Sequence, residues 1–247
     1  MTAEGAAAFL LCNPHNPTGT VHTADELAGV AAAAEGTGVH VVADEIHAPL
    51  VLPGAVFTSY LAVPGGGRGF ALVSASKGWN LPGLKAAVAF AGPDAAADLA
   101  RLPEEVSHGA SHLAVLAHTA ALRHGQEWLD AVLVGLDRNR TLLGDLLGAN
   151  LPRVRWVPGA ATYLAWLDFG DLPGVAAADG RAGSARGDAS ARVGVAAWLH
   201  EHARVLLSSG PAFGAGGEHC ARLNFATSAS VLTEAVDRMA EAVAKAA

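Results

Sequence analysis

The feature that most constrains the fold is a strand–helix–strand succession near the start of the chain. "AAAFLLC" and "VHVVADE" are short apolar runs, typical of buried strands. Between them, "TADELAGVAAAAEGTG" has helical composition, with Thr23 placed to cap its start and Gly36 or Gly38 to end it. Strands joined through a helix pair in parallel, because a tight hairpin cannot join parallel strands. The sequence therefore predicts an α/β sheet, which "GFALVSAS" and "AAVAFAG" would extend.

The chain changes character after about residue 100, where helical periodicity begins. "VSHGASHLAVLAHTAALRHG" and "QEWLDAVLVGLDRNRTLLGDLLGAN" predict helices, and "RVRWV", "TYLAWLDF" and "CARLNFAT" predict strands. "ARVGVAAWLHEHA" and "SVLTEAVDRMAEAVAKAA" predict two more helices, with the extended "RVLLSSG" between them. We therefore expect a large domain over residues 1–125 and a small α+β domain over 126–247. The Ala/Gly/Ser-rich stretch 174–190 is expected to be a mobile surface insertion.

Composition excludes several classes of protein. Of the 247 residues, 51% are hydrophobic and 16% charged, which indicates a packed globular protein. A net charge of -7 without a basic stripe argues against a nucleic-acid partner. No apolar run reaches transmembrane length, and the start lacks the basic region of a signal peptide. Cys12 and Cys220 form no CxxC motif, so we expect a reduced, cytosolic protein without a membrane partner.

The scarcity of lysine draws attention to "SASKGWNLPGLK". The chain has thirteen arginines but only three lysines, Lys77, Lys85 and Lys245. Arginine can hold an anion but keeps its proton near neutral pH, whereas a free lysine amine can condense with an aldehyde. The stretch therefore predicts amine chemistry at one lysine and anion binding at the other, and Ser74 and Ser76 could help to bind a phosphate. Two solvated lysines in a loop are the alternative.

Two further polar elements follow predicted strands. "NPHNPTG" comes after the first strand, and its two Asn-Pro pairs could fix amide side chains at the sheet edge where open α/β sheets bind ligands. "ADEIH" ends the second strand and places Asp44 where it could meet a cationic group. An ordinary turn and an acidic loop start are the alternatives. Because all three elements end successive strands, one pocket could gather them.

Taken in order, "LLCNPHNPTGTV", "VVADEIHAPLVLPG" and "SASKGWNLPGLKAA" resemble the fold-type I enzymes of pyridoxal 5'-phosphate (PLP). This is the class I/II aminotransferase superfamily, and the motifs look most like its cystathionine β-lyase or C–S lyase branch. The resemblance runs from about residue 8 to the C-terminus. It implies the PLP-transferase fold type I, with part of a mainly parallel large domain and an α+β small domain.

The resemblance also implies that a part is missing. In the family, an N-terminal part supplies a phosphate-binding loop, an aromatic that stacks on the cofactor ring and a tyrosine that reaches the partner's site. Here "NPHNPTG" begins at residue 13, so the chain looks like the C-terminal portion of a longer enzyme. We therefore expect this chain alone to bind PLP poorly, whereas the full-length form would be a homodimer.

The resemblance assigns a role to each matching residue. Lys77 would attach to the PLP aldehyde and later shuttle protons, and Asp44 would pair with the protonated pyridine nitrogen. Asn16 would hydrogen-bond the phenolic oxygen of the ring. The other matching residues are Ser74 and Lys85 for the phosphate, His47 beside the cofactor, and Arg222 for the substrate α-carboxylate.

Two departures from the aminotransferase pattern favour the lyase branch. His47 stands where aminotransferases usually have Tyr, and Lys85 where they usually have Arg. We therefore expect a PLP-dependent C–S β-lyase that converts cystathionine or related cysteine S-conjugates into thiol, pyruvate and ammonia. An aminotransferase, which would share the same core residues, and a non-catalytic protein of the same fold are the alternatives.

Three other motifs are weaker functional signals. "SASK" matches the S-x-x-K of serine acylases, but the S-D-N and K-T-G partners do not occur in the chain. His108 and His112 are four residues apart, as metal-binding histidines can be, but no acidic third ligand stands beside them, so no metal site is expected. "PGGGRG" over 64–69 precedes a strand rather than a helix, which favours a surface turn over a phosphate loop.

Overall fold

The computed structural model describes residues 5–170, 172 and 194–246, in two compact units. Unit 1 comprises Met1–Asn16, Thr20–Val134 and Ala160–Thr162, and unit 2 comprises Pro17–Gly19, Gly135–Gly159 and Tyr163–Ala247. Helix α5 (Gln126–Asn150) contributes residues to both units. The insertion predicted at 174–190 lies outside the described residues. Across the described ranges, no helix combines the length and apolar character needed to span a membrane.

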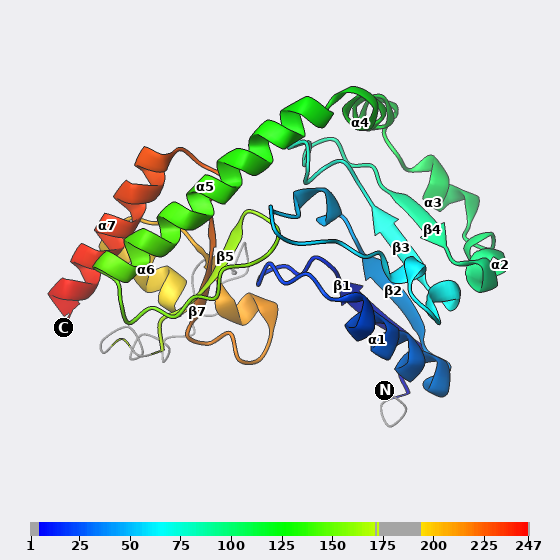
Figure 1. Cartoon of the computed structure of the whole chain (residues 1–247), viewed down its shortest axis with the longest axis horizontal. Helices are drawn as coiled ribbons and strands as arrows, with labels where there is room; N and C mark the ends of the chain where they lie inside the picture. The colour runs from blue at the N-terminus through cyan, green and yellow to red at the C-terminus, as the bar shows by residue number, and fades with distance from the viewer. Residues whose placement is uncertain (1–4, 171, 173–193, 247) are drawn as a thin grey trace. The chain divides into compact units, whose positions relative to one another are not determined.

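Unit 1 is built on a four-stranded sheet (Figure 1). Its strands lie side by side in chain order: β1 (Ala8–Cys12), β2 (His40–Asp44), β3 (Phe70–Val73) and β4 (Val88–Ala91). The first three are parallel, and β4 runs antiparallel to β3. All four strands and the parallel pairing of the first two were predicted, so the α/β class with a mainly parallel sheet is confirmed.

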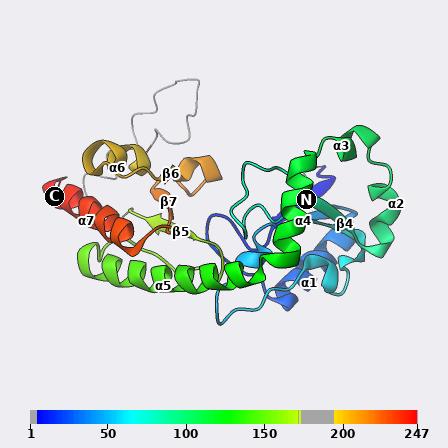
Figure 2. The same ribbon diagram turned by 90° about the horizontal axis from the view of Figure 1, so that it is seen from above.

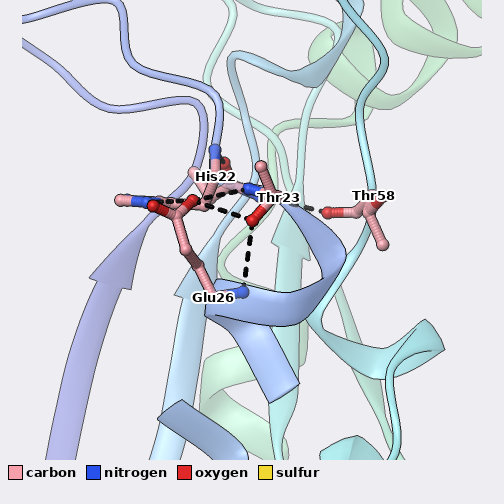
Figure 3. Close-up of polar contacts among 5 residues, drawn as sticks. His22, Thr23, Glu26 and Thr58 are labelled. Atoms are coloured by element: carbon pink, nitrogen blue, oxygen red, sulfur yellow. Dashed lines mark hydrogen bonds and ion pairs between the residues drawn. The ribbon is translucent and has the colours of Figure 1, made fainter. Parts of the chain in front are cut away.

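Helix α1 (Ala24–Thr37) forms the connection between β1 and β2. The Thr23 hydroxyl accepts a 3.2 Å hydrogen bond from the Glu26 amide, and the Glu26 carboxylate accepts a 2.8 Å bond from the Thr23 amide (Figure 3). This reciprocal capping box satisfies two amides that the helix cannot pair itself. The helix ends at Gly38, whose φ of 70° is accessible to glycine without strain. The predicted cap is confirmed, and Gly38 rather than Gly36 ends the helix.

The core of unit 1 lies between α1 and one face of the sheet. Leu27 of α1 and Val41 of β2 are each only 1% exposed and belong to one hydrophobic cluster. Side chains alternate between faces along a strand, so Leu10 of β1 points away from this cluster and is 78% exposed. At β1, therefore, α1 covers one face of the sheet, and the face that carries Leu10 is exposed.

The helical stretch after β4 is divided. The sequence predicted helix over 106–125, but α3 (Glu104–His108) and α4 (His112–His124) are separate, because the backbone turns at Gly109 and becomes extended at Ser111. His108 and His112 therefore lie on different helices, and His108 Nε2 is 3.2 Å from Glu104 Oε1. The remaining short elements of unit 1 are α2 (Ala96–Leu99), η2 (Ala48–Leu50), η3 (Tyr60–Ala62), η4 (Gly66–Arg68) and η5 (Pro93–Ala95).

Unit 2 contains a three-stranded antiparallel sheet in the order β5-β7-β6. The strands are β5 (Leu164–Asp168), β6 (Ser208–Ser209) and β7 (Cys220–Asn224), and the short η8 (Gly210–Phe213) follows β6. Helices α6 (Val195–Ala203) and α7 (Ala229–Ala246) pack beside one another (Figure 2). Along α7 the buried residues recur at helical spacing: Leu232, Val236, Met239 and Ala242.

One predicted strand of unit 2 is wrong. "RVRWV" does not form a strand; among the residues that the structure describes, its one ladder contact is an isolated bridge between Arg155 and Asp168. Pro152 and Pro158 lie on either side of it, and neither can donate a hydrogen bond to a ladder. The bridge is supported by a side-chain ion pair in which Arg155 Nη2 lies 2.8 Å from Asp168 Oδ2.

Candidate functional site

The predicted cofactor residues of unit 1 come together at one edge of its sheet. Because β1, β2 and β3 are parallel, their carboxyl ends meet at the same edge. The register aligns Cys12 with Asp44, and Asp44 with Leu72. Strand β4 runs the other way, so its first residue, Val88, lies opposite Val73, the last residue of β3. The segments that carry Asn16, Asp44, Ser74, Lys77 and Lys85 therefore all leave or enter the sheet there.

The turn after β1 is fixed by Asn13, the first asparagine of the "NPHNPTG" turn, to which the sequence gave no individual role. Asn13 is completely buried, and its peptide bond to Pro14 is cis. Its Nδ2 donates to the Thr58 carbonyl at 3.1 Å, and its Oδ1 accepts from the His22 amide at 3.0 Å. Its own backbone amide donates to the Asp44 carbonyl at 3.0 Å. Asn13 thus ties together β2, the start of α1 and the loop that carries Thr58, the last two of which appear in Figure 3.

Asn16 and Asp44 both act on the Cys12 thiol. Burial raises the pKa of this thiol, a hydrogen bond from the Asn16 backbone lowers it, and the Asp44 carboxylate raises it again. The Cys12 Sγ also donates to the Pro14 carbonyl at 3.4 Å. The structure therefore brings Asn16 and Asp44, which the sequence placed on different elements, to the same small region of the edge.

Asp44 and His47 are both held by the backbone after β2. Asp44 is half-buried, and its Oδ1 accepts a 3.1 Å hydrogen bond from the Ile46 amide, which orients the carboxylate. His47 is only 3% exposed and begins η2, where its carbonyl accepts from the Leu50 amide at 2.9 Å. Both residues are therefore fixed by local backbone contacts at the strand end.

Glu45, between these two residues, is a buried carboxylate to which the sequence assigned no role. It is 3% exposed, and its Oε1 accepts from the Ser59 hydroxyl at 3.0 Å and from the Tyr60 amide at 2.8 Å. Burial raises the pKa of Glu45, whereas these two hydrogen bonds lower it. Glu45 anchors the end of β2 to η3, and so helps to hold Asp44 in place.

The two lysine segments are joined by a serine. Ser74 Oγ donates to the Ala86 carbonyl at 2.7 Å and accepts from the Ser76 amide at 3.1 Å. Lys77 is half-buried and Lys85 is exposed, and within the described parts of the chain neither ammonium group makes a hydrogen bond or ion pair. Lys245 instead lies on α7 of unit 2, with its Nζ 3.6 Å from Glu241 Oε2.

The donor set at this edge fits PLP. The cofactor needs an amine for its aldehyde, an anion for its pyridine nitrogen and donors for its phosphate. Lys77 and Asp44 are the predicted residues for the first two, and Lys85 is the predicted cation for the third. Ser74 could contribute as a phosphate donor only after its hydroxyl turns from Ala86, because a hydroxyl carries a single proton. The individual roles of these residues remain predictions.

Arg222, the predicted carboxylate residue, lies on β7 of unit 2. Its Nη2 donates to the Ser208 hydroxyl at 3.0 Å, and its Cζ lies 4.9 Å from the centre of the Phe213 ring. Burial lowers the pKa of Arg222, and nearby Tyr163 raises it. A guanidinium keeps its charge in proteins, so Arg222 is a cation, and the Ser208 hydroxyl and the Phe213 ring are among its contacts.

Comparison with known proteins gives the class. Residues 2–239 match the family described as aminotransferase class I and II. The chain belongs to this family, as its motifs predicted.

More specific likenesses are to lyases. A Mycobacterium tuberculosis protein provisionally named cystathionine beta-lyase is 59% identical over 98% of this chain, which spans 59% of that protein's length. A crystal structure of a provisionally assigned PLP-dependent beta-cystathionase from Corynebacterium diphtheriae is 35% identical, with a TM-score of 0.83, and the match covers 98% of this chain and 60% of that one. The PLP-bound C-S lyase of Staphylococcus hominis is 26% identical, with a TM-score of 0.82 and coverage of 96% and 58%. These likenesses confirm the PLP fold type I.

Proposed function

We propose that the chain is part of a PLP-dependent C–S β-lyase that acts on cystathionine or related cysteine S-conjugates. The observation that carries the proposal is that β1, β2 and β3 are parallel neighbours. The segments that carry Asn16, Asp44 and Lys77 lie at the carboxyl ends of these strands, and so at one edge of the sheet. Relatives with lyase names support the branch. Because the chain spans 59% of the Mycobacterium tuberculosis relative, activity of residues 1–247 alone is part of what must be tested.

Three residues would serve the reacting end of the cofactor. When bound, PLP supplies a ring that accepts the negative charge developed at the substrate α-carbon. The Lys77 amine would hold the cofactor aldehyde and then take the proton from that carbon. Asp44 would keep a proton on the pyridine nitrogen, and its carboxylate is already oriented by the Ile46 amide. The Asn16 amide would donate to the phenolic oxygen.

The other predicted residues would bind and orient. Lys85 and Ser74 would hold the phosphate, and Arg222 would hold the substrate α-carboxylate through two parallel hydrogen bonds. His47 would line the cofactor site from the segment after Asp44. We also propose a homodimer for the full-length form, which sedimentation would test.

The reaction would break one carbon–sulfur bond. As Lys77 removes the α-proton, the electron pair of that C–H bond would form a second bond between the α- and β-carbons. The carbon–sulfur bond would break with its electron pair on sulfur, which takes up a proton and leaves as the thiol. Water then converts the remaining three-carbon fragment into pyruvate and ammonia, so no external oxidant or acceptor is needed. An aminotransferase would instead require a keto acid. It is the second candidate, because the family that the chain matches is described by that activity.

The test uses two proteins. One is the chain of 247 residues, and the other joins it to the residues of the Mycobacterium tuberculosis relative that lie outside the match. Each is incubated with PLP and cystathionine and no keto acid, and pyruvate is measured with lactate dehydrogenase while free thiol is measured with a disulfide dye. Equal amounts of both products, lost in Lys77→Ala, are expected. Amino transfer only with added keto acid would favour the aminotransferase, and no product from a PLP-loaded protein would favour a non-catalytic role.

A further inference from the structure

Arg222 occupies the centre of a small cluster in unit 2. Strand β7 lies between β5 and β6, and Arg222 is aligned with Trp166 on one side and with Ser208 on the other. Directly opposite residues of antiparallel strands point to the same face of a sheet. The Arg222 side chain therefore shares its face with an indole ring and with the hydroxyl that it contacts at 3.0 Å.

The segment between β6 and β7 closes on itself through two glycines. A Cβ atom added to Gly210 would lie 2.0 Å from the Gly217 carbonyl oxygen, and one added to Gly217 would lie 2.3 Å from the Gly210 oxygen. Neither position has room for a side chain. Gly214, with φ of 114°, makes the turn that follows Phe213. The backbone can close this tightly only because both residues are glycine, and Phe213 lies within the segment that this contact closes.

Phe213 links the members of the cluster. Its ring centre lies 4.9 Å from Arg222 Cζ and 5.3 Å from the Trp166 ring, which it meets edge to face at 80°. The first distance is within the range of an attractive cation–π contact, and the second is that of a favourable aromatic pair. Phe213 is 37% exposed, whereas an aromatic residue that only packs the core would be buried. The ring thus supports the guanidinium from this closed segment at the surface of the unit.

We propose that Phe213 is a positioning residue that holds the Arg222 guanidinium in the orientation that binds a carboxylate. The proposal rests on the proposed function, in which Arg222 receives the substrate α-carboxylate. A long arginine side chain loses much rotamer freedom when it binds a ligand, and a residue that orders it beforehand removes part of that cost. Phe213 would therefore affect the binding of substrates that carry a carboxylate, and not the chemical step.

The first test observes Arg222 directly. Nitrogen-15 NMR of the arginine Nε–Hε groups is recorded for the full chain, and the Arg222 signal is assigned by its loss in Arg222→Lys. Wild type and Phe213→Tyr, which keeps the ring, should give a sharp signal displaced by the ring current. Phe213→Leu, which keeps an apolar side chain, should move the signal to the position of a mobile arginine. Val157→Ala, a truncation at an 84% exposed site in the same unit, is the control and should change nothing.

The second test measures binding with a matched pair of probes. L-Methionine carries a carboxylate, and 3-(methylthio)propylamine is the same molecule without it. Methionine should shift the Arg222 signal in wild type, and its dissociation constant should rise about fivefold in Phe213→Leu, as expected when one long side chain must be ordered during binding and not beforehand. The amine should leave the Arg222 signal unmoved in every variant.

The outcomes separate the two proposals. An Arg222 signal that is already mobile in wild type, or that is unchanged in Phe213→Leu, would overturn the positioning role, and the wild-type measurement decides even if that variant does not fold. An ordered Arg222 that loosens in Phe213→Leu supports the role, whether or not methionine binds. If methionine fails to move an ordered Arg222 signal in wild type, the failure lies with the carboxylate-binding role in the proposed function.

Discussion

The hydroxyl of Ser74 donates a 2.7 Å hydrogen bond to the carbonyl oxygen of Ala86. This contact connects the segment after β3, which carries Lys77, to the segment before β4, which carries Lys85. The Ser74 hydroxyl is therefore one of the contacts that hold the two lysine segments together. The same hydroxyl is the predicted phosphate donor, but it carries a single proton, so it would donate either to the Ala86 carbonyl or to the phosphate.

Ser74→Ala should weaken unit 1 and the binding of PLP together. Loss of this half-buried hydrogen bond should lower the free energy of unfolding by about 1 kcal/mol. Urea unfolding and titration of the visible PLP band measure the two effects. Ser107→Ala is the matched control, because the Ser107 hydroxyl also donates to a carbonyl, at 2.8 Å from the Glu104 oxygen, but is exposed. If the Ser74 variant behaves like this control, Ser74 neither stabilises unit 1 nor helps to bind PLP.

Lys77→Arg should abolish turnover while keeping the positive charge, because arginine cannot condense with an aldehyde. The test uses the PLP-loaded protein that joins this chain to the unmatched residues of the Mycobacterium tuberculosis relative. Borohydride reduction followed by peptide mass mapping should place the pyridoxyl group on Lys77. Lys85→Arg is the control and should leave that label in place. A label on Lys85 or Lys245, with Lys77 unmodified, would show that the lysine assignment is wrong.

Asp44→Asn should leave the fold intact, because the amide oxygen can still accept the hydrogen bond from Ile46. It should lower kcat at least about 100-fold, on the order of 3 kcal/mol, because the pyridine nitrogen loses its anionic partner. Steady-state pyruvate release measures the change. Asp25→Asn, in the exposed first turn of α1, is the control. Activity near that of wild type would make Asp44 a strand-end charge without a catalytic role.

Asn13→Ala should destabilise unit 1 by about 2 kcal/mol or more, because the Thr58 carbonyl and the His22 amide both lose a buried partner. Urea unfolding measures the loss. The Asn150 side chain also makes a hydrogen bond, at 3.0 Å to Asp237, but it is exposed, and Asn150→Ala should cost far less. Equal losses in the two variants would mean that Asn13 does not tie the turn to its neighbours.

Glu45→Gln should change how stability depends on pH. Burial raises the pKa of Glu45 in the folded chain above its unfolded value, so its contribution to stability is fully present below the unfolded pKa and is lost as the pH rises through the folded pKa. Glutamine does not titrate, and its oxygen can still accept from Ser59 and Tyr60. Urea midpoints from pH 4 to 7 should therefore move in favour of the variant as the pH rises. A constant difference would show that Glu45 does not titrate in this range.

Local signals in the sequence predicted most of the elements. Thr23 and Glu26 identify the start of α1, and strand-like runs identify the strands of both sheets. The errors arise where composition is compatible with two outcomes. "RVRWV" has the composition of a strand, but in the part of the chain that the structure describes only Arg155 finds a ladder partner. The predicted helix over 106–125 breaks at Gly109, a position at which glycine is compatible with either a turn or a helix.

Within the candidate site, only residues that belong to a recognisable sequence motif could be predicted. Asp44 and Lys77 follow strands within recognisable stretches, so their segments could be placed at one edge. The "NPHNPTG" motif indicated that an asparagine such as Asn13 could be fixed there, but neither its partners nor the role of Phe213 could be predicted, because the residues concerned are distant in the chain. Asn13 contacts Thr58, and Phe213 lies in a segment closed by two glycines that exclude each other's side chains.

The register of the sheet in unit 1 also dictates when this edge can form during folding. Cys12 and Leu72 flank Asp44 on neighbouring strands, yet sixty positions of chain separate them. Contacts between distant segments form late, because the entropy of closing the intervening loops must be overcome first. In the proposed site PLP contacts Asn16, Asp44 and Lys77 together, so it would bind only to chains that have completed the sheet. Because PLP would bind the folded chain and not the unfolded one, it would shift the folding equilibrium toward chains with a complete sheet. PLP would then stabilise the fold in addition to its part in the reaction.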